Sequence, residues 1–190
     1  EVSSQIDRSN ADHFALFAVT SSTFISMTGS STNLNIVEQS TGYETDDENE
    51  LSFKELAGIA TNKNYAFVSD KANNVVIKYD ITGFTSGDVA KSLSTDTLLG
   101  QRRNFIELVG GFGGATRQTK FNAPTIVACD DQEIAVFDSG NRVVKIFDIN
   151  FNFITSINSL NLNAETFGSM EYDPDFGVLY IITYAISEIT

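Results

Sequence analysis

The chain has a single cysteine and a single histidine among its 190 residues. One cysteine cannot form a disulfide within the chain, so no disulfide framework supports the fold. Cys129 lies in an apolar run, which predicts a small buried hydrophobe rather than a reactive thiol. One histidine, His13, excludes a zinc site built from several histidines of this chain. A Ser-His-Asp triad would have to recruit His13 from a predicted strand, and no neighbouring residue suggests this.

Basic residues are also scarce, with 12 lysines and arginines against 25 acidic residues and a net charge of −13. A surface that binds DNA or RNA needs a basic footprint, so the composition argues against a nucleic-acid partner. No run of about 18 apolar residues occurs, so we expect no membrane span. The charge is uneven: residues 1–60 and 121–190 each carry −8, whereas residues 61–120 carry +3.

Three short apolar runs lie close together in the second half of the chain. They are Thr125–Cys129, Ile134–Phe137 and Val143–Phe147, and Asp, Asn, Gly and Ser separate them. Such runs predict strands joined by tight turns. Because the runs are nearly continuous in hydrophobicity rather than alternating, we expect a sheet that is covered on both faces.

This stretch has a second copy earlier in the chain. A shift of 68 residues lays 53–81 over 121–149 without a gap, and nine of the 29 positions are identical. The identities fall on the predicted strand cores and on the turns. An internal repeat of one supersecondary unit is typical of a propeller or a solenoid.

The second copy resembles an NHL repeat. The resemblance rests on Phe121–Pro124, Ile126–Ala128, Ala135–Val143 and Phe147–Asp148, with a glycine-rich lead-in at 110–114. The first copy is weaker and has Leu56 in place of the proline. The resemblance implies an all-β fold, a β-propeller of four-stranded antiparallel blades. It does not imply one activity, because one fold serves many functions.

The repeat suggests four units in one propeller segment. They are a degenerate blade at 12–50, a blade at 51–109 with an insertion at 84–104, a blade at 110–157 and a partial blade at 158–190. Residues 1–12 are polar and predict a connection, and 43–50 (YETDDENE) predict an acidic loop. Closed propellers have about 4–8 blades. The sequence starts at Glu1 and stops within an apolar run, so we expect an incomplete ring or an excerpt of a longer one.

Asp70 and Asp138, with Asn73 and Asn141, recur at one offset in the two copies. A catalytic residue need occur only once, whereas a fold-making residue recurs. We therefore expect each aspartate to hold the turn between the second and third strands by accepting backbone hydrogen bonds, and each asparagine to adopt a left-handed backbone.

Glycine and acidic motifs elsewhere predict no ligand site. Residues 110–114 lack a G-x-G-x-x-G pattern and a P-loop lysine, so they predict a flexible lead-in rather than a phosphate cradle. Residues 46–50 lack the spaced ligands of a calcium loop, and 173–177 predict a turn before an ion site. We assign no cofactor and no catalytic residue, and calcium stays open.

The insertion is the leading candidate for partner binding. Long loops on rigid scaffolds carry function more often than strands do. The segment lies in the net-positive third of the chain and offers cations and apolar side chains with no blade position to fill. These are Lys91, Leu98, Leu99, Arg102 and Arg103.

The interpretation favoured by the sequence is a non-catalytic propeller scaffold that binds other protein subunits, including copies of itself, within a larger assembly. Strands rich in Asn, Ser and Thr, two prolines and no glycosylation sequon favour a virion or appendage protein of a phage, and hence an extracellular or virion-associated place. Two alternatives stay open. One is a calcium-dependent hydrolase or lactonase, because propellers that resemble gluconolactonases bind one calcium in the central channel. The other is a ligand-binding sensor ectodomain.

Overall fold

The computed structural model describes residues 2–6, 14–30, 33–40, 42–44, 50–81, 105–158, 167–173 and 175–184. Every regular element within these ranges is a β-strand. None of the described residues is helical, so none belongs to a helix long and apolar enough to cross a membrane. The all-β class that the sequence predicts is confirmed.

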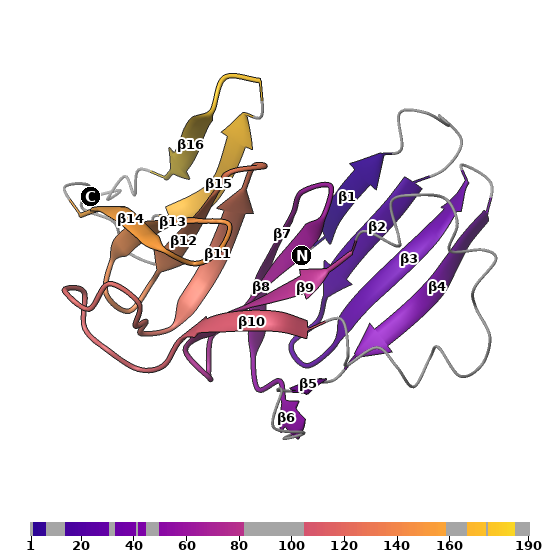
Figure 1. Cartoon of the computed structure of the whole chain (residues 1–190), viewed down its shortest axis with the longest axis horizontal. Helices are drawn as coiled ribbons and strands as arrows, with labels where there is room; N and C mark the ends of the chain where they lie inside the picture. Colours follow the sequence, from indigo (N-terminus) through magenta and orange to yellow (C-terminus); the bar gives the residue numbers. More distant parts are fainter. Residues whose placement is uncertain are drawn as a thin grey trace, which may run out of the picture.

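Three four-stranded antiparallel sheets and two hairpins make up the described structure (Figure 1). The first sheet is β1 (Val2–Ile6), β2 (Phe14–Val19), β3 (Phe24–Ser30) and β4 (Asn33–Ser40). The second is β7 (Leu56–Thr61), β8 (Tyr65–Asp70), β9 (Val75–Asp80) and β10 (Phe105–Gly110). The third is β11 (Pro124–Cys129), β12 (Glu133–Asp138), β13 (Val143–Asp148) and β14 (Phe153–Ile157). The hairpins are β5 (Gly42–Glu44) with β6 (Glu50–Ser52), and β15 (Phe167–Asp173) with β16 (Val178–Thr183).

The sheets are the blades of a β-propeller. In each four-stranded sheet the strands follow one another in chain order from one edge to the other. The first strand of each blade contacts its neighbours: β7 lies against β1, β2 and β11, and β11 lies against β15. The blades therefore follow one another in an arc, as Figure 1 shows, with β15 and β16 beginning a fourth blade.

The hydrophobic core consists of three clusters, one between each pair of neighbouring blades. Val19 of the first blade packs with β7–β9 residues such as Ile59 and Ile77. Phe67 of the second blade packs with Phe147 of the third. Phe137 of the third blade packs with Phe167 of the fourth, the two rings stacked at 3.8 Å between centroids. The middle strands β8 and β12 are buried on both faces, as their continuous hydrophobicity predicts.

The internal repeat extends to the backbone register. β7, β8 and β9 map onto β11, β12 and β13 with the offset of 68 residues that the sequence shows. Leu56 pairs with Asp70 and Pro124 pairs with Asp138, and a bulge follows each of these pairs at the same point. The two copies are thus one structural unit built twice.

Two expectations about the first 50 residues are wrong. Residues 2–6 do not form a connection: they are β1, which pairs with β2 from Val2–Ala18 to Ile6–Phe14 and completes the first blade. The ends of the predicted acidic loop pair as strands β5 and β6. Strand propensity did not predict β1, because its residues are mostly polar. Polar residues can still form a strand when a neighbouring strand supplies the hydrogen bonds.

Candidate functional site

Asp138 ends β12 and is fully buried. Its carboxylate accepts hydrogen bonds from the backbone N–H of Asn122 at 2.7 Å and from the side-chain amide of Asn141 at 2.7 Å. It also pairs with the ammonium of Lys145 at 2.9 Å, and both side chains have no exposed surface. A buried charge must be paired and hydrogen-bonded, and this carboxylate is both. It fixes the β12–β13 turn to the segment that enters β11.

Lys145, on β13, holds the segment that precedes β11. Besides the carboxylate of Asp138, its ammonium donates to the carbonyl oxygens of Arg117, at 3.0 Å, and Lys120. The ammonium also lies 5.2 Å from the centre of the Phe121 ring. An ammonium has three donors, and each has an acceptor here. Lys145 therefore ties β13 to the segment that precedes β11.

Asp70 repeats the carboxylate of Asp138 but not its lysine. It accepts from the backbone N–H groups of Lys54 and Glu55, at 2.9 and 3.1 Å, and from the N–H and side-chain amide of Asn73. Ile77 stands in β9 where β13 has Lys145. The predicted left-handed asparagines are wrong: Asn74 and Arg142, each one residue later, have φ of 59° and 58°. Asn73 and Asn141 instead donate their side-chain amides to the aspartates.

Three glycines of the predicted flexible lead-in, at positions 110, 111 and 113, are constrained by the fold. Gly110 and Gly111 have φ of 145° and 95°, which only glycine adopts without strain. The N–H of Gly111 donates to the carbonyl of Asn74, and a Cβ on Gly113 would lie 2.5 Å from the Cβ of Lys120. Backbone conformation therefore requires glycine at positions 110 and 111, and close contact requires it at position 113.

A second set of turn residues repeats in three blades, and sequence reasoning did not single it out. The side-chain oxygens of Asn62, Asp130 and Asp173 each accept the backbone N–H groups two and three residues later. Each such residue caps the turn between the first and second strands of its blade. The signal was an Asn or Asp at the end of each first strand: Asn62 and Asp130 directly follow β7 and β11, and Asp173 is the last residue of β15. Such residues are common turn openers.

One end of the blades, the acidic face, gathers carboxylates. It contains the β7–β8, β11–β12, β13–β14 and β15–β16 turns and the strand ends beside them. From Phe53 onward, Lys63 is the one exposed cation described there, and it pairs with Asp131 at 3.2 Å. The acidic residues of this face are Asp80, Glu107, Asp130, Asp131, Glu133, Asp148, Glu171, Asp173 and Asp175.

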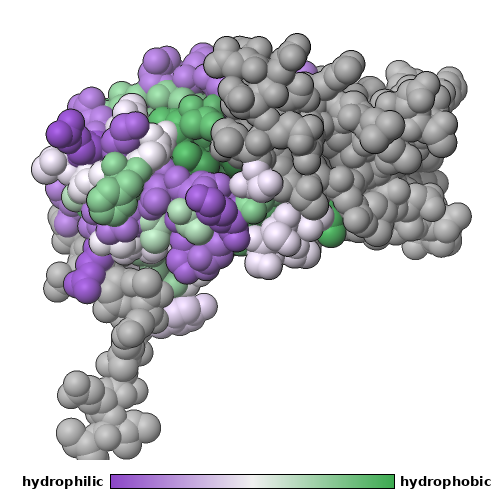
Figure 2. All heavy atoms as spheres, turned by 90° about the horizontal axis from the view of Figure 1, so that it is seen from below, coloured by the Kyte–Doolittle hydropathy of each residue, from purple (hydrophilic) through white to green (hydrophobic). Residues whose placement is uncertain are grey.

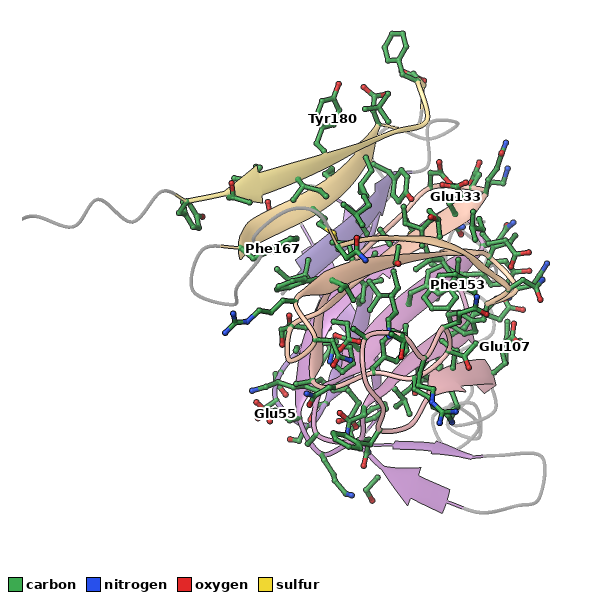
Figure 3. The ribbon with its side chains drawn as sticks, turned by 90° about the vertical axis from the view of Figure 1, so that its left-hand side faces the viewer. Glu55, Glu107, Glu133, Phe153, Phe167 and Tyr180 are labelled. Atoms are coloured by element: carbon green, nitrogen blue, oxygen red, sulfur yellow. The ribbon has the colours of Figure 1, made fainter. Side chains whose placement is uncertain are left out.

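The opposite end, the basic face, carries the cations. It contains the β8–β9 and β12–β13 turns and the segments that enter β7 and β11. Glu55 is the one exposed acid described there from Phe53 onward, and it pairs with Lys71 at 2.6 Å. In Figure 3, Glu55 lies on the left of the molecule, whereas Glu107 and Glu133 lie on the right. The cations of this face are Lys54, Lys71, Arg117, Lys120 and Arg142.

The 111–120 segment forms part of the surface of the basic face. Figure 2 views the molecule from the side on which this segment lies in Figure 1, and hydrophilic residues predominate among the coloured atoms. Phe112 is nevertheless 76% exposed. The basic face therefore combines cations with an exposed aromatic ring.

Two titratable groups near the acidic face have raised pKa values. Burial, reinforced by the negative charges of Asp130, Glu171 and Asp131, raises the pKa of the Cys129 thiol well above its ordinary value. Burial also raises the pKa of Tyr172, whose hydroxyl donates to Glu133 at 3.2 Å. Both groups are neutral at pH 7. Cys129 is half-buried, and its raised pKa accords with the unreactive thiol that the sequence predicts.

The residues that the sequence singles out for partner binding lie outside the described residues. These are Lys91, Leu98, Leu99, Arg102 and Arg103. The described chain stops at Ile81, after β9, and resumes at Phe105, the first residue of β10. Ile81 and Phe105 both lie at the end of the blade that belongs to the acidic face.

No group of three or more His, Cys, Asp or Glu side chains with the geometry of a metal site occurs among the described residues. The buried aspartates, Asp70 and Asp138, are each surrounded by donors of the protein itself. The described residues thus assemble a rigid core and two charged faces.

Comparison with known proteins supports the fold. No family model and no curated protein matches the chain. A glutaminyl cyclase from Myxococcus xanthus aligns with a TM-score of 0.51 over 96% of this chain and 68% of its own, at 11% identity. A putative 6-phosphogluconolactonase from Bacteroides uniformis gives 0.49 over 95% and 64%, at 9% identity. Hsv2 from Kluyveromyces lactis gives 0.46 over 88% and 44%, at 10% identity. The likeness to the glutaminyl cyclase shows a shared fold, and the chain is a β-propeller built from four-stranded antiparallel blades.

Proposed function

We propose that this chain is a non-catalytic, NHL-like propeller scaffold that mediates protein–protein contacts in a larger assembly, such as a virion or a viral appendage. The observation that carries the proposal is the separation of exposed charge onto two opposite faces of a rigid core. Faces of opposite sign orient a molecule toward charged partners and suppress wrong encounters.

The state of the buried charged groups supports a structural role for the core. Asp70, Asp138 and Lys145 are satisfied by protein groups. Lys78 is 3% exposed, and its ammonium donates to Glu107 and to the carbonyl of Ile149. A general acid, base or nucleophile must reach its substrate, and these groups are all engaged within the fold.

The partner-binding residues of the proposal are those of the insertion: Lys91, Leu98, Leu99, Arg102 and Arg103. They offer cations and apolar side chains to an acidic partner, which includes the 43–50 segment of another copy. The neighbouring strand ends carry the acidic face, so the insertion would bring positive charge to a negative surface. This contrast is suited to selecting a partner by charge.

The test uses the whole chain with an affinity tag, expressed in its native host. Lys91, Arg102 and Arg103 are replaced together by Glu, and a second variant lacks residues 86–102. The matched control replaces Lys54, Lys71 and Arg142 of the basic face by Glu. We expect the wild type and the control to recover partner subunits in fixed stoichiometry, and both insertion variants to lose these subunits. All variants should keep the wild-type melting temperature. Loss from the control alone would instead assign binding to the basic face.

A calcium-dependent hydrolase is the second candidate, because the aligned glutaminyl cyclase and the aligned putative lactonase are named as enzymes. Calcium titration by calorimetry, together with lactone hydrolysis assays, distinguishes the candidates. A scaffold should show no stoichiometric calcium binding and no turnover. Saturable binding with calcium-dependent turnover would replace the scaffold proposal.

A further inference from the structure

The 111–120 segment is exposed along most of its length, yet its conformation is defined by hydrogen bonds. Phe112 is 76% exposed, and every residue from 114 to 120 is exposed. A tight turn forms within the segment, because the N–H of Arg117 donates to the carbonyl of Gly114 at 3.0 Å. The segment therefore presents an aromatic ring and a cation, those of Phe112 and Arg117, from a structured backbone.

A buried ion pair of the third blade holds this segment from within the core. The ammonium of Lys145 donates to the carbonyls of Arg117 and Lys120. Lys145 is also paired with Asp138, and both side chains are fully buried. Burial of two charges costs desolvation free energy, which the pairing and the added hydrogen bonds must offset. Here the pair fixes a segment that lies at the surface.

The second blade shows that a blade can form without this lysine. Ile77 takes the place of Lys145 there, and Asp70 still accepts the hydrogen bonds of its turn. What Lys145 adds in the third blade is the fixed conformation of the 111–120 segment. A segment that is ordered before its partner arrives loses less conformational entropy on binding.

The acidic face of the same chain offers a complementary surface. Its β15–β16 turn carries Asp175 and Phe176, whose ring is 79% exposed. The β11–β12 turn lies beside it, since β11 contacts β15, and it adds Asp130 and Asp131. Neither turn contains a lysine or an arginine. One face thus combines a phenylalanine with cations, and the other combines a phenylalanine with carboxylates.

The two surfaces lie at opposite ends of the blades. Figure 1 shows the segment between β10 and β11 at the bottom of the view and the β15–β16 turn at the top. Neighbouring blades pack on one another chiefly through strand residues, which form the three core clusters. A further blade of the same ring would therefore pack against the side of a blade and would not cover the turns at its ends.

We propose that the 111–120 segment of one copy of this chain docks on the acidic face of a second copy. Phe112 packs against Phe176, and Arg117 lies among the carboxylates of the β11–β12 and β15–β16 turns, with Lys145 as the positioning residue. Aromatic and arginine side chains of this kind are enriched at the centres of interfaces. Because two different surfaces meet, the contact is head-to-tail, and successive copies form a row. The inference rests on the scaffold role proposed above, names a second copy as a partner, and uses no residue of the insertion.

Sedimentation velocity of the full chain measures this contact. We expect self-association that rises with concentration at about 0.05 M salt and weakens at about 0.5 M, because salt screens the charges of both surfaces. A segment variant combines Phe112→Ala with Arg117→Glu, and a face variant combines Asp175→Lys with Phe176→Ala. Each variant should raise the dissociation constant at least about tenfold. An equal mixture of the two should form 1:1 dimers, because each variant supplies the surface that the other lacks.

A third variant tests the positioning role of Lys145. Lys145→Ile copies Ile77 of the second blade, so Asp138 should keep the turn hydrogen bonds that Asp70 has. Amide hydrogen exchange of the 111–120 segment should become faster, and self-association should weaken about threefold, because the segment is no longer held in place. The matched control combines Ile154→Ala with Lys54→Glu, which also removes an exposed apolar side chain and reverses a cation. This control should self-associate as the wild type does.

Other outcomes overturn the proposal. A wild-type chain that is monomeric at every concentration removes it, and so does a mixture of the two variants that stays monomeric. Faster exchange without weaker self-association removes the role of Lys145. Self-association that the segment variant keeps and deletion of residues 86–102 abolishes would assign the contact to the insertion. If that deletion leaves partner subunits bound while the segment variant is monomeric, the proposed role of the insertion is refuted and this contact stands.

Discussion

β12 and β16 occupy the same place in successive blades and differ in what surrounds them. Each pairs with the first strand of its blade, with a register shift at the same point. Five of the six β12 residues are buried, whereas none of the six β16 residues is. VLYIIT has no charged residue and EIAVFD has two. Burial here therefore follows from neighbouring blades and not from the hydrophobicity of the strand itself.

The difference also extends to the residue that ends each strand. Asp138 ends β12 and binds the next turn, the entering segment and Lys145. Thr183 has that place in β16 and is exposed. A strand enclosed on both sides can support a buried ion pair, because its neighbours supply the remaining hydrogen bonds. β16 has no second neighbouring strand among the described residues.

The largest effect should come from the stacked ring between the third and fourth blades. Phe137→Ala should lower the free energy of unfolding by about 4 kcal/mol, because it removes a fully packed aromatic side chain and leaves a cavity. Ile182→Ala, at the same place in β16, should change it by less than about 1 kcal/mol. Urea unfolding of both variants tests the comparison. Equal losses would mean that β16 is packed in solution.

The buried ion pair should give the next largest effect. Asp138→Ala should cost about 3 kcal/mol, because it leaves the Lys145 ammonium buried without its partner. The unsatisfied turn amides by themselves would account for about 1–3 kcal/mol. Asp70→Ala should cost about 2 kcal/mol, since no lysine is stranded there. Chemical denaturation ranks the two, and a larger loss at Asp70 would contradict the role given to Lys145.

A smaller effect is expected where the second and third blades approach most closely. A Cβ on Gly58 would lie 2.3 Å from the carbonyl oxygen of Thr125, so Gly58→Ala should cost about 2 kcal/mol through a forced backbone shift. Ser169, the counterpart in β15, is exposed. Ser169→Ala should stay within about 0.5 kcal/mol of the wild type. Thermal melts of the two variants provide the measurement.

The smallest effect concerns the reactivity of Cys129. Its pKa is raised chiefly by burial, so the thiolate fraction at a given pH is lower than for a free cysteine. At pH 8, alkylation of the folded chain should be at least about tenfold slower than in urea. Reaction at the unfolded rate would show that the end of β11 is open to solvent.

The sequence predicted the repeated blades because their determinants are local. Apolar runs, an Asp-x-x-Asn turn and a constant offset require no knowledge of distant contacts. It missed β1, whose residues VSSQI become a strand only through pairing with β2. It also assigned the left-handed backbone to Asn73 and Asn141, one residue before Asn74 and Arg142. The conformation at a single turn position depends on what the turn contacts.

The candidate surfaces were less predictable. The net charge of −13 does not reveal the basic face. Successive turns along the chain lie at opposite ends of a blade, so the net charge adds together residues from both ends. In the sequence, Lys145 looks like any other polar residue of a strand. In the structure, its buried ammonium binds the 111–120 segment from within the core. Such pairings join residues that are distant in the chain.

The sequence by itself determined the all-β class, the blade repeat and the aspartates that hold its turns, because hydrogen bonding and side-chain alternation act over a few residues. Only the tertiary structure decided which cations are buried, which end of the blades is acidic and which of the described strands are exposed. The physical reason is that burial and electrostatic fields are sums over neighbours. Strands at the same place in successive blades, such as β12 and β16, therefore reach different states according to what lies beside them.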